Sequence, residues 1–205
     1  PEHGKIIANA YEQMKHDPAH PKVKESYNAL INETSKQYHD LLKEGYRFTP
    51  VSDPSKYPYK NSKEMHFDIE QNKHLAYFPT ESGFGSESST PADHPLLSPT
   101  SFKTADGKPM LANDLLRQVH DINGHFKGGR TGFGPKGEHQ SYLHHRKMYS
   151  PKAQPALASE LMGKNNTVNW GKHGEFNRAN PSQTKFAEQK AGLLPRHIIE
   201  EDWHL

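Results

Sequence analysis

Fifteen glycines and sixteen prolines interrupt this 205-residue chain, and they limit most strongly what it can fold into. Both residue types end regular helices and strands, so the ordered elements must be short and separated by irregular segments. The hydrophobic fraction is only 32%, which leaves little material for a large interior. We therefore predict a mainly α-helical compact domain with a few short strands and long irregular loops.

Hydrophobic spacing divides this single structural domain into three regions. Residues 1–48 carry apolar side chains at helical spacing on both sides of Asp17-Pro18, which predicts an antiparallel helical pair that ends at Gly45. Residues 49–112 predict a loop-rich connection with short strands. Within it we expect a helix over 63–70, a strand over 74–78, a surface loop over 81–99 and a tight turn at Asp106-Gly107.

Residues 113–205 form the third region, which we expect to be helical and to carry the metal site. A helix is predicted to begin at Asn113, and others over 137–149 and 156–163, the last capped by Gly163. A final helix is predicted from Phe186 to Gly192.

Charge and hydropathy exclude several classes of protein. The formal net charge is +2, so there is no global electrostatic signature of nucleic-acid or membrane binding. No run approaches the roughly 18 apolar residues of a membrane span, and the beginning of the chain lacks the apolar region of a signal peptide. We expect a soluble protein that is not secreted by a signal of its own.

The residue types available for metal binding are restricted because the chain has no cysteine. A metal would have to be held by histidine, aspartate and glutamate. The chain has 15 histidines, and several cluster between positions 120 and 145. This clustering makes a divalent metal the first cofactor to consider.

The pair His120 and His125 is the centre of that cluster. Leu115, Val119 and Ile122 form the buried stripe of the helix that begins at Asn113, and His120 lies beside it. In a continuing α-helix, five steps of about 100° would point His125 roughly 140° away from His120. We expect Asn123-Gly124 to end the helix and turn His125 back toward His120. The alternative is a pair of structural histidines.

The third metal ligand is predicted to be Glu160, on a largely apolar helix where a buried carboxylate would need a metal or a cation as partner. An ordinary exposed glutamate is the alternative. Glu138 and His145 share one helical face roughly 10 Å apart, so they can flank one site more easily than bind one ion together. We assign them, with Asp121, as acid and base or as groups that hold the ligands in place.

A glycine-rich basic loop follows His125 and contains Lys127 and Arg130. Such a loop at a helix N-terminus can bind an anion such as phosphate or the backbone of a nucleic acid, although a plain flexible loop fits equally. Asn165 and Asn169 add amide groups that either satisfy a loop or bind a polar ligand.

The run from Asn113 to Trp170 resembles a domain encoded by bacteriophages and other mobile elements. The likeness is carried by Val119-His-Asp-Ile-Asn-Gly-His-Phe126, by Gly134-Pro-Lys-Gly-Glu138, and by His145, Met148-Tyr149, Glu160, Asn165 and Val168-Asn169. It extends through the N-terminal helices and through Phe186 to Pro195. The resemblance implies a phage context, with a location in the host cytoplasm or on the virion, and implies no reaction.

His120-Asp-Ile-Asn-Gly-His125 is also similar to the iron site of the pterin-dependent aromatic amino acid hydroxylases. Their His-Glu-x-x-Gly-His motif supplies two iron ligands, and a downstream glutamate supplies the third. The resemblance implies a two-histidine, one-carboxylate site of His120, His125 and Glu160. It covers only the motif, and Asp121 replaces the family's glutamate. Hydroxylation of an amino acid therefore does not carry over.

Three functions follow from these features. The first is a metal-dependent enzyme with a mononuclear site, with Fe(II) favoured over Zn(II), that activates oxygen or water. The second is a zinc-dependent peptidase or nuclease, in which Glu138 or Asp121 serves as base and Lys127 and Arg130 meet a phosphate. The third is a non-enzymatic phage structural or interaction protein with a closed metal shell or none.

Overall fold

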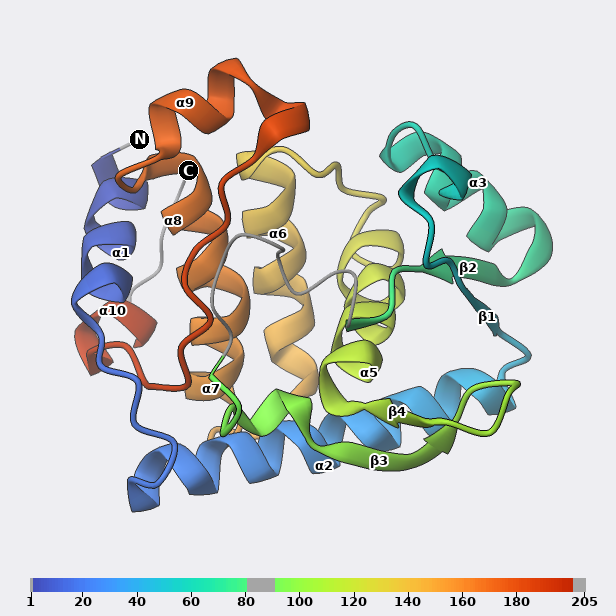
Figure 1. Ribbon diagram of the computed structural model, residues 1–205, viewed down its shortest axis with the longest axis horizontal. Coiled ribbons are helices and arrows are strands. Elements are labelled where there is room, and N and C mark those ends of the chain that lie inside the picture. Colours follow the sequence, from blue (N-terminus) through green and yellow to red (C-terminus); the bar gives the residue numbers. More distant parts are fainter. Residues whose placement is uncertain (1, 81–90, 201–205) are drawn as a thin grey trace.

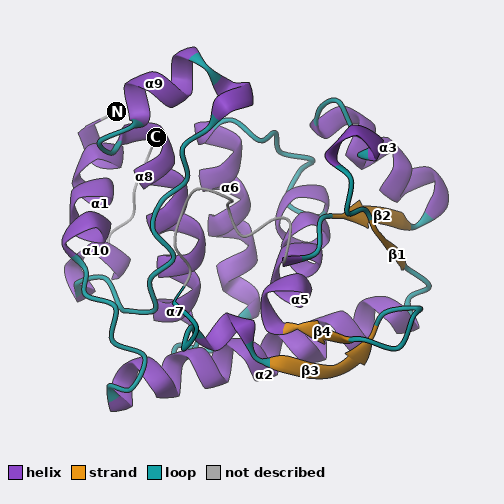
Figure 2. Cartoon of the chain, in the orientation of Figure 1, coloured by secondary structure: helices purple, strands orange, loops and turns teal. Residues whose placement is uncertain are grey.

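The computed structural model describes residues 2–80 and 91–200 (Figure 1). Within this part the chain is mainly helical, and its strands form two small sheets of two strands each (Figure 2). The predicted fold class is confirmed. No helix in these residues is both long and apolar enough to cross a membrane.

The helices are α1 (Glu2–Gln13), α2 (Pro21–Lys43), α3 (Ser62–Asn72), α5 (Ala112–Val119), α6 (Pro135–His145), α7 (Gln154–Ala158), α8 (Lys164–Trp170), α9 (Gly174–Ala179) and α10 (Arg196–Glu200). Two π-helices continue α-helices: His120–Phe126 follows α5, and Ser159–Gly163 joins α7 to α8. Short 3-10 helices span Pro54–Lys56, Pro95–Leu97, Arg146–Met148 and Pro181–Gln183.

The two N-terminal helices form close to the predicted positions, and Gly45 ends α2 with a positive φ of 98°. They do not pack along each other as the expected antiparallel pair. Instead α1 lies against α8, while α2 runs across α5 and α7 (Figure 1). Glycine allows the close approach of α1, since a Cβ on Gly163 would lie 2.7 Å from Cδ2 of Tyr11.

The strands are β1 (Arg47–Pro50), β2 (His74–Tyr77), β3 (Pro99–Lys103) and β4 (Pro109–Leu111). β2 confirms the strand predicted over 74–78. It pairs in parallel with β1, which spans the boundary between the predicted helical pair and the loop-rich connection and was not itself predicted. β3 and β4 form the predicted hairpin around Gly107, whose φ is 84°. Part of the predicted surface loop, residues 81–90, lies outside the described residues.

Two helix predictions near the C-terminus are wrong. Gly163 does not end a helix, because the chain continues from α7 through the π-helix into α8. Residues 184–195 are irregular rather than helical. This segment is held by hydrogen bonds to other parts of the chain: Lys190 Nζ donates to the carbonyls of Tyr11, Glu12 and Met14, Ser159 Oγ donates to that of Gly192, and the Asp17 amide donates to that of Ala191.

Helix α5, which leads into the histidine pair, packs between two hydrophobic clusters. Leu116 packs into the cluster of Tyr27, Leu30 and Leu157, whereas Leu115 and Val119 pack into a second cluster near the two sheets. Burial on both sides fixes the rotation of α5 about its axis. The residues that follow α5 therefore start from a rigid position.

Candidate metal centre

His120 and His125 converge because the helix changes its winding instead of ending. The expected stop at Asn123-Gly124 is wrong: α5 runs on as a π-helix to Phe126, and the amide of Lys127 donates to the carbonyl of Ile122, five residues back, at 2.8 Å. In a π-helix the backbone hydrogen bonds join residues five apart, so such residues lie closer to one face than they do in an α-helix. The two imidazole rings are consequently 4.9 Å apart between centroids, so the predicted convergence is confirmed.

Gly124 permits this arrangement because it has no side chain. A Cβ at this position would lie 2.6 Å from Nδ1 of His120, closer than real Cβ contacts. Any larger residue would push the His120 ring out of place. The glycine that the sequence indicated as a helix stop is required for packing against the ring of His120.

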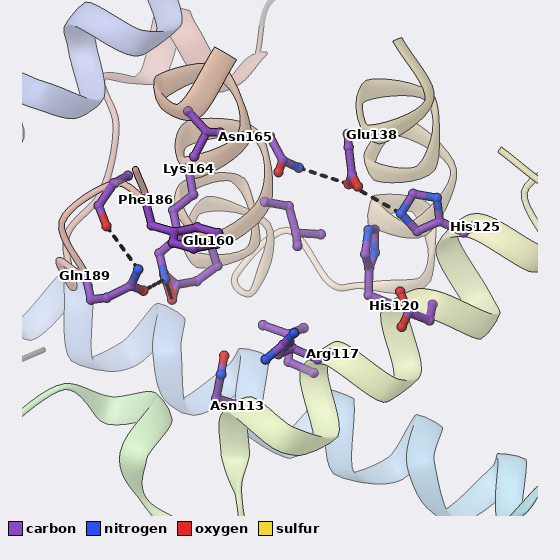
Figure 3. Close-up of a pocket in the computed structure, with 15 residues that line it drawn as sticks. Asn113, Arg117, His120, His125, Glu138, Glu160, Lys164, Asn165, Phe186 and Gln189 are labelled. Atoms are coloured by element: carbon purple, nitrogen blue, oxygen red, sulfur yellow. Dashed lines mark hydrogen bonds and ion pairs between the residues drawn. The ribbon is translucent and has the colours of Figure 1, made fainter. Parts of the chain in front are cut away.

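Glu138 supplies the carboxylate closest to the histidine pair. It lies in the first turn of α6, and its Oε2 is 3.3 Å from Nε2 of His125 (Figure 3). Within the described residues, His120, His125 and Glu138 form a group whose potential ligand atoms all lie within 4.8 Å of one another. Two ligands about 2.1 Å from one ion lie at most about 4.2 Å apart, so small side-chain rotations would let all three bind it.

Glu160 lies on another wall of the same cavity and is not part of that group. Its carboxylate is buried, as predicted, but the partners are Lys164 Nζ at 3.0 Å, the Tyr27 hydroxyl at 3.3 Å and His94 Nε2 at 3.6 Å. Lys164 is four residues further along the same helix, within direct reach. The structure thus brings together the two predicted histidines with Glu138 in place of Glu160.

His145 lies behind His120 and determines which of its nitrogens can bind a metal. Gln37 Nε2 donates to the Met148 carbonyl, which leaves Gln37 Oε1 to accept the proton of His145 Nε2 at 3.0 Å. Burial lowers the pKa of His145 to about 3, so the ring is neutral and its Nδ1 is an acceptor. His120 Nδ1, 3.0 Å away, must then donate to it.

His120 is therefore a neutral ring with its lone pair on Nε2. Burial lowers the pKa of His120 well below its usual value, and the neighbouring His125 and His145 lower it further. Ser141 Oγ, which donates to the Glu138 carbonyl at 2.7 Å, lies 3.2 Å from this Nε2. Metal-binding histidines usually donate the proton of their second nitrogen to a partner, as His120 Nδ1 does to His145.

His125 is held in the same orientation by Thr131. Its Nδ1 lies 2.8 Å from the Thr131 hydroxyl and 3.3 Å from the Thr131 carbonyl, which can only accept, so Nδ1 is the donor and Nε2 faces Glu138. Burial by itself would lower the pKa of His125, but the hydrogen bond and charge of Glu138 raise it. A bound metal would replace the proton between these two groups.

The other predicted residues divide between the cavity and the surface. Asn165 lines the cavity and donates to Glu138 Oε2 at 3.2 Å, so it holds a potential ligand. Asp121 lines it too, and burial raises its pKa to about 6 against the opposing charges of His125 and Arg117. Asn169 donates to the Asn165 carbonyl and is absent from the cavity lining.

The basic loop does not reach the cavity. Lys127 Nζ lies 3.1 Å from a carboxylate oxygen of Glu44, just after α2, and Arg130 lies 2.6 Å from that of Glu70 in α3. Both cations are therefore paired with carboxylates outside the cavity. Neither cation is among the residues that line the cavity.

The cavity has a volume of about 380 Å³. His120, His125 and Glu138 form one part of its wall, and three polar residues that the sequence did not single out also line it: Arg117, Lys164 and Gln189. Gln37, which orients His145, was also missed. A signal for it exists, because it is a polar residue in the buried stripe Leu30, Thr34, Gln37 and Leu41 of α2.

No family model, no curated protein and no solved structure matches this chain.

Proposed function

We propose that this protein is a metal-dependent enzyme that binds one divalent ion through His120, His125 and Glu138. The observation that carries the proposal is the convergence of their ligand atoms within 4.8 Å at the wall of a cavity large enough for a small molecule. Two histidines and one carboxylate leave coordination positions for oxygen or substrate. Fe(II) with oxygen activation is the chemistry that we favour, in a protein of phage or mobile-element origin.

A zinc-dependent hydrolase is the second candidate, because catalytic zinc is held by the same three donor types. The observation that favours it is Asp121, a carboxylate that lines the same cavity next in sequence to His120. With Glu138 as a ligand, Asp121 takes the role of base toward the attacking water. A purely structural metal is less well supported, since structural sites are closed by protein ligands rather than bordered by a cavity.

The test is a metal titration of the tag-free protein under anaerobic conditions with Fe(II) and separately with Zn(II). We expect about one equivalent per chain in wild type, and a loss of binding in His120→Ala and Glu138→Gln. Glu160→Gln is the matched control, since it removes a carboxylate of the same cavity that is outside the metal-binding group. Equal metal binding by Glu138→Gln and wild type would contradict the proposed site.

Activity assays of the metal-loaded protein then distinguish the reaction classes. Dioxygen consumption by the Fe(II) form that is absent from Glu138→Gln would support the oxygenase. Hydrolysis of peptide or phosphodiester probes by the Zn(II) form, with loss in Asp121→Asn, would support the hydrolase. A metal that binds but whose removal unfolds the protein, with neither activity, would favour a structural role.

A further inference from the structure

We propose that the cavity beside His120, His125 and Glu138 binds a small organic anion with an apolar body, and that Arg117 supplies the cation that selects it. This inference deepens the proposed function and rests on it, because the bound ion contributes to the charge of the cavity. It names the class of substrate for a site whose reaction is proposed above.

The charges that line the cavity favour an anion once a divalent ion is bound. Among the lining residues that the structure describes, two cationic side chains, Arg117 and Lys164, accompany three carboxylates, Asp121, Glu138 and Glu160. A divalent ion reverses this balance and leaves one positive charge in excess. Charges act more strongly in a partly enclosed site than in bulk water, so a ligand with one negative charge is favoured over a neutral one of the same shape.

Each cation has a carboxylate four residues away: the charge of Arg117 acts on Asp121, and Lys164 is paired with Glu160. Lys164 Nζ contacts Glu160 Oε1 at 3.0 Å and Gln189 Oε1, so two acceptors hold it at the wall across from the histidines (Figure 3). Arg117 lies on α5, about one turn before His120, and lines the same cavity as the proposed ligands. A guanidinium offers a planar pair of donors that matches a carboxylate or a phosphate.

The remaining wall indicates the size and polarity of the rest of the ligand. Leu116, Leu161, Val168 and Phe186 contribute apolar surface, and Phe186 is 50% exposed. A volume of about 380 Å³ is at the lower end of the range for small-molecule sites. This combination fits a single ring or a branched chain that carries one acidic group, rather than a polymer.

The experiment is isothermal titration calorimetry of the Zn(II)-loaded protein with benzoate, phenyl phosphate and benzamide. Benzamide has the shape of benzoate without its charge. We expect one or both anions to bind at least about ten times more tightly than benzamide, and the stronger of the two identifies the acidic group. Equal binding of benzoate, phenyl phosphate and benzamide would overturn the proposal.

Substitutions of Arg117 test whether the anion binds at this residue. Arg117→Met should weaken anion binding about tenfold without a loss of Zn(II) binding, and Arg117→Lys should restore part of the anion binding. Arg130→Met is the matched control, because it removes an arginine outside the cavity lining. Circular dichroism establishes that each variant is folded. Unchanged anion binding in Arg117→Met, or an equal loss in Arg130→Met, would refute the assignment.

The two proposals fail separately. A chain that takes up no metal contradicts the proposed function, and the anion titration is then made on that chain. Benzoate or phenyl phosphate binding that depends on Arg117 would still support an anion site, whereas its absence would overturn it. Metal uptake without selective anion binding would leave the metal site standing and reject only the substrate class.

Discussion

The backbone of Gly124 lies so close to the ring of His120 that a Cβ on it would be 2.6 Å from Nδ1. This contact links the packing of the π-helix to the position of a proposed metal ligand. Nδ1 is also the atom that donates to His145, so a displaced ring would lose both its hydrogen bond and its orientation.

Gly124→Ala should therefore destabilise the fold and weaken metal binding together. Overpacking of a buried site costs about 1–3 kcal/mol, and we expect a loss of unfolding free energy in that range in urea denaturation. Gly132→Ala is the control, since the nearest contact of a Cβ there is a Ser62 hydroxyl at an ordinary 3.6 Å. If Gly124→Ala behaves like Gly132→Ala in stability and metal titration, the packing argument is wrong.

Removal of the acceptor behind His120 should reduce metal affinity without removing a ligand. His145→Leu leaves His120 Nδ1 without its partner, and loss of such a supporting bond typically lowers metal affinity about 10- to 100-fold. His145→Gln retains one acceptor and one donor and should recover most of the affinity. Metal titration followed by competition with a chelator measures the affinities of both variants. Equal affinities would argue against the hydrogen bond to His145 as the contact that orients His120.

The buried neutral histidines should make the metal-free protein sensitive to acid. The folded pKa of His145 is about 3, below the value near 6.5 of an unfolded histidine. The unfolded state therefore binds the extra proton between these values, and stability that is fully present above about pH 6.5 is lost as the pH falls toward 3. One such group contributes a slope approaching about 1.4 kcal/mol per pH unit.

His145→Gln removes that group and should flatten the acid limb of the stability curve by about this slope. His120 titrates in the same direction, so part of the dependence should persist in the variant. Urea denaturation of chelator-treated protein between pH 4 and 8 measures the difference. Parallel curves for wild type and variant would show that His145 is not kept neutral by the fold.

Glu160 should matter for stability and not for the metal. Its buried carboxylate accepts hydrogen bonds from Lys164 and Tyr27 and also faces His94. A hydrogen bond to a charged group contributes about 1.5–3 kcal/mol to stability. Glu160→Gln should lower the unfolding free energy by roughly that amount and leave metal stoichiometry unchanged. A variant that loses its metal while it remains folded would return Glu160 to the ligand set.

Local sequence signals were sufficient for much of the secondary structure. The positive-φ turns at Gly45 and Gly107 follow from glycine itself, and the apolar spacing of α2 and α5 follows from helical periodicity. Predictions based on one glycine inside a helix were less successful. Gly124 and Gly163 were interpreted as helix ends, yet both lie within continuous helices where neighbouring side chains exclude a Cβ.

The sequence by itself determined the chemistry that is available: with no cysteine, nitrogen and oxygen ligands remain, and His120 and His125 are their centre. Only the tertiary structure decided that Glu138, and not Glu160, approaches this pair. The reason is that spacing along the chain fixes directions within one helix, whereas the distance between carboxylate and histidine depends on how α6 and the Glu160 helix pack beside α5. The π-winding that brings residues five apart toward one face is a change in backbone hydrogen bonding, which the 3.6-residue spacing of apolar side chains does not indicate.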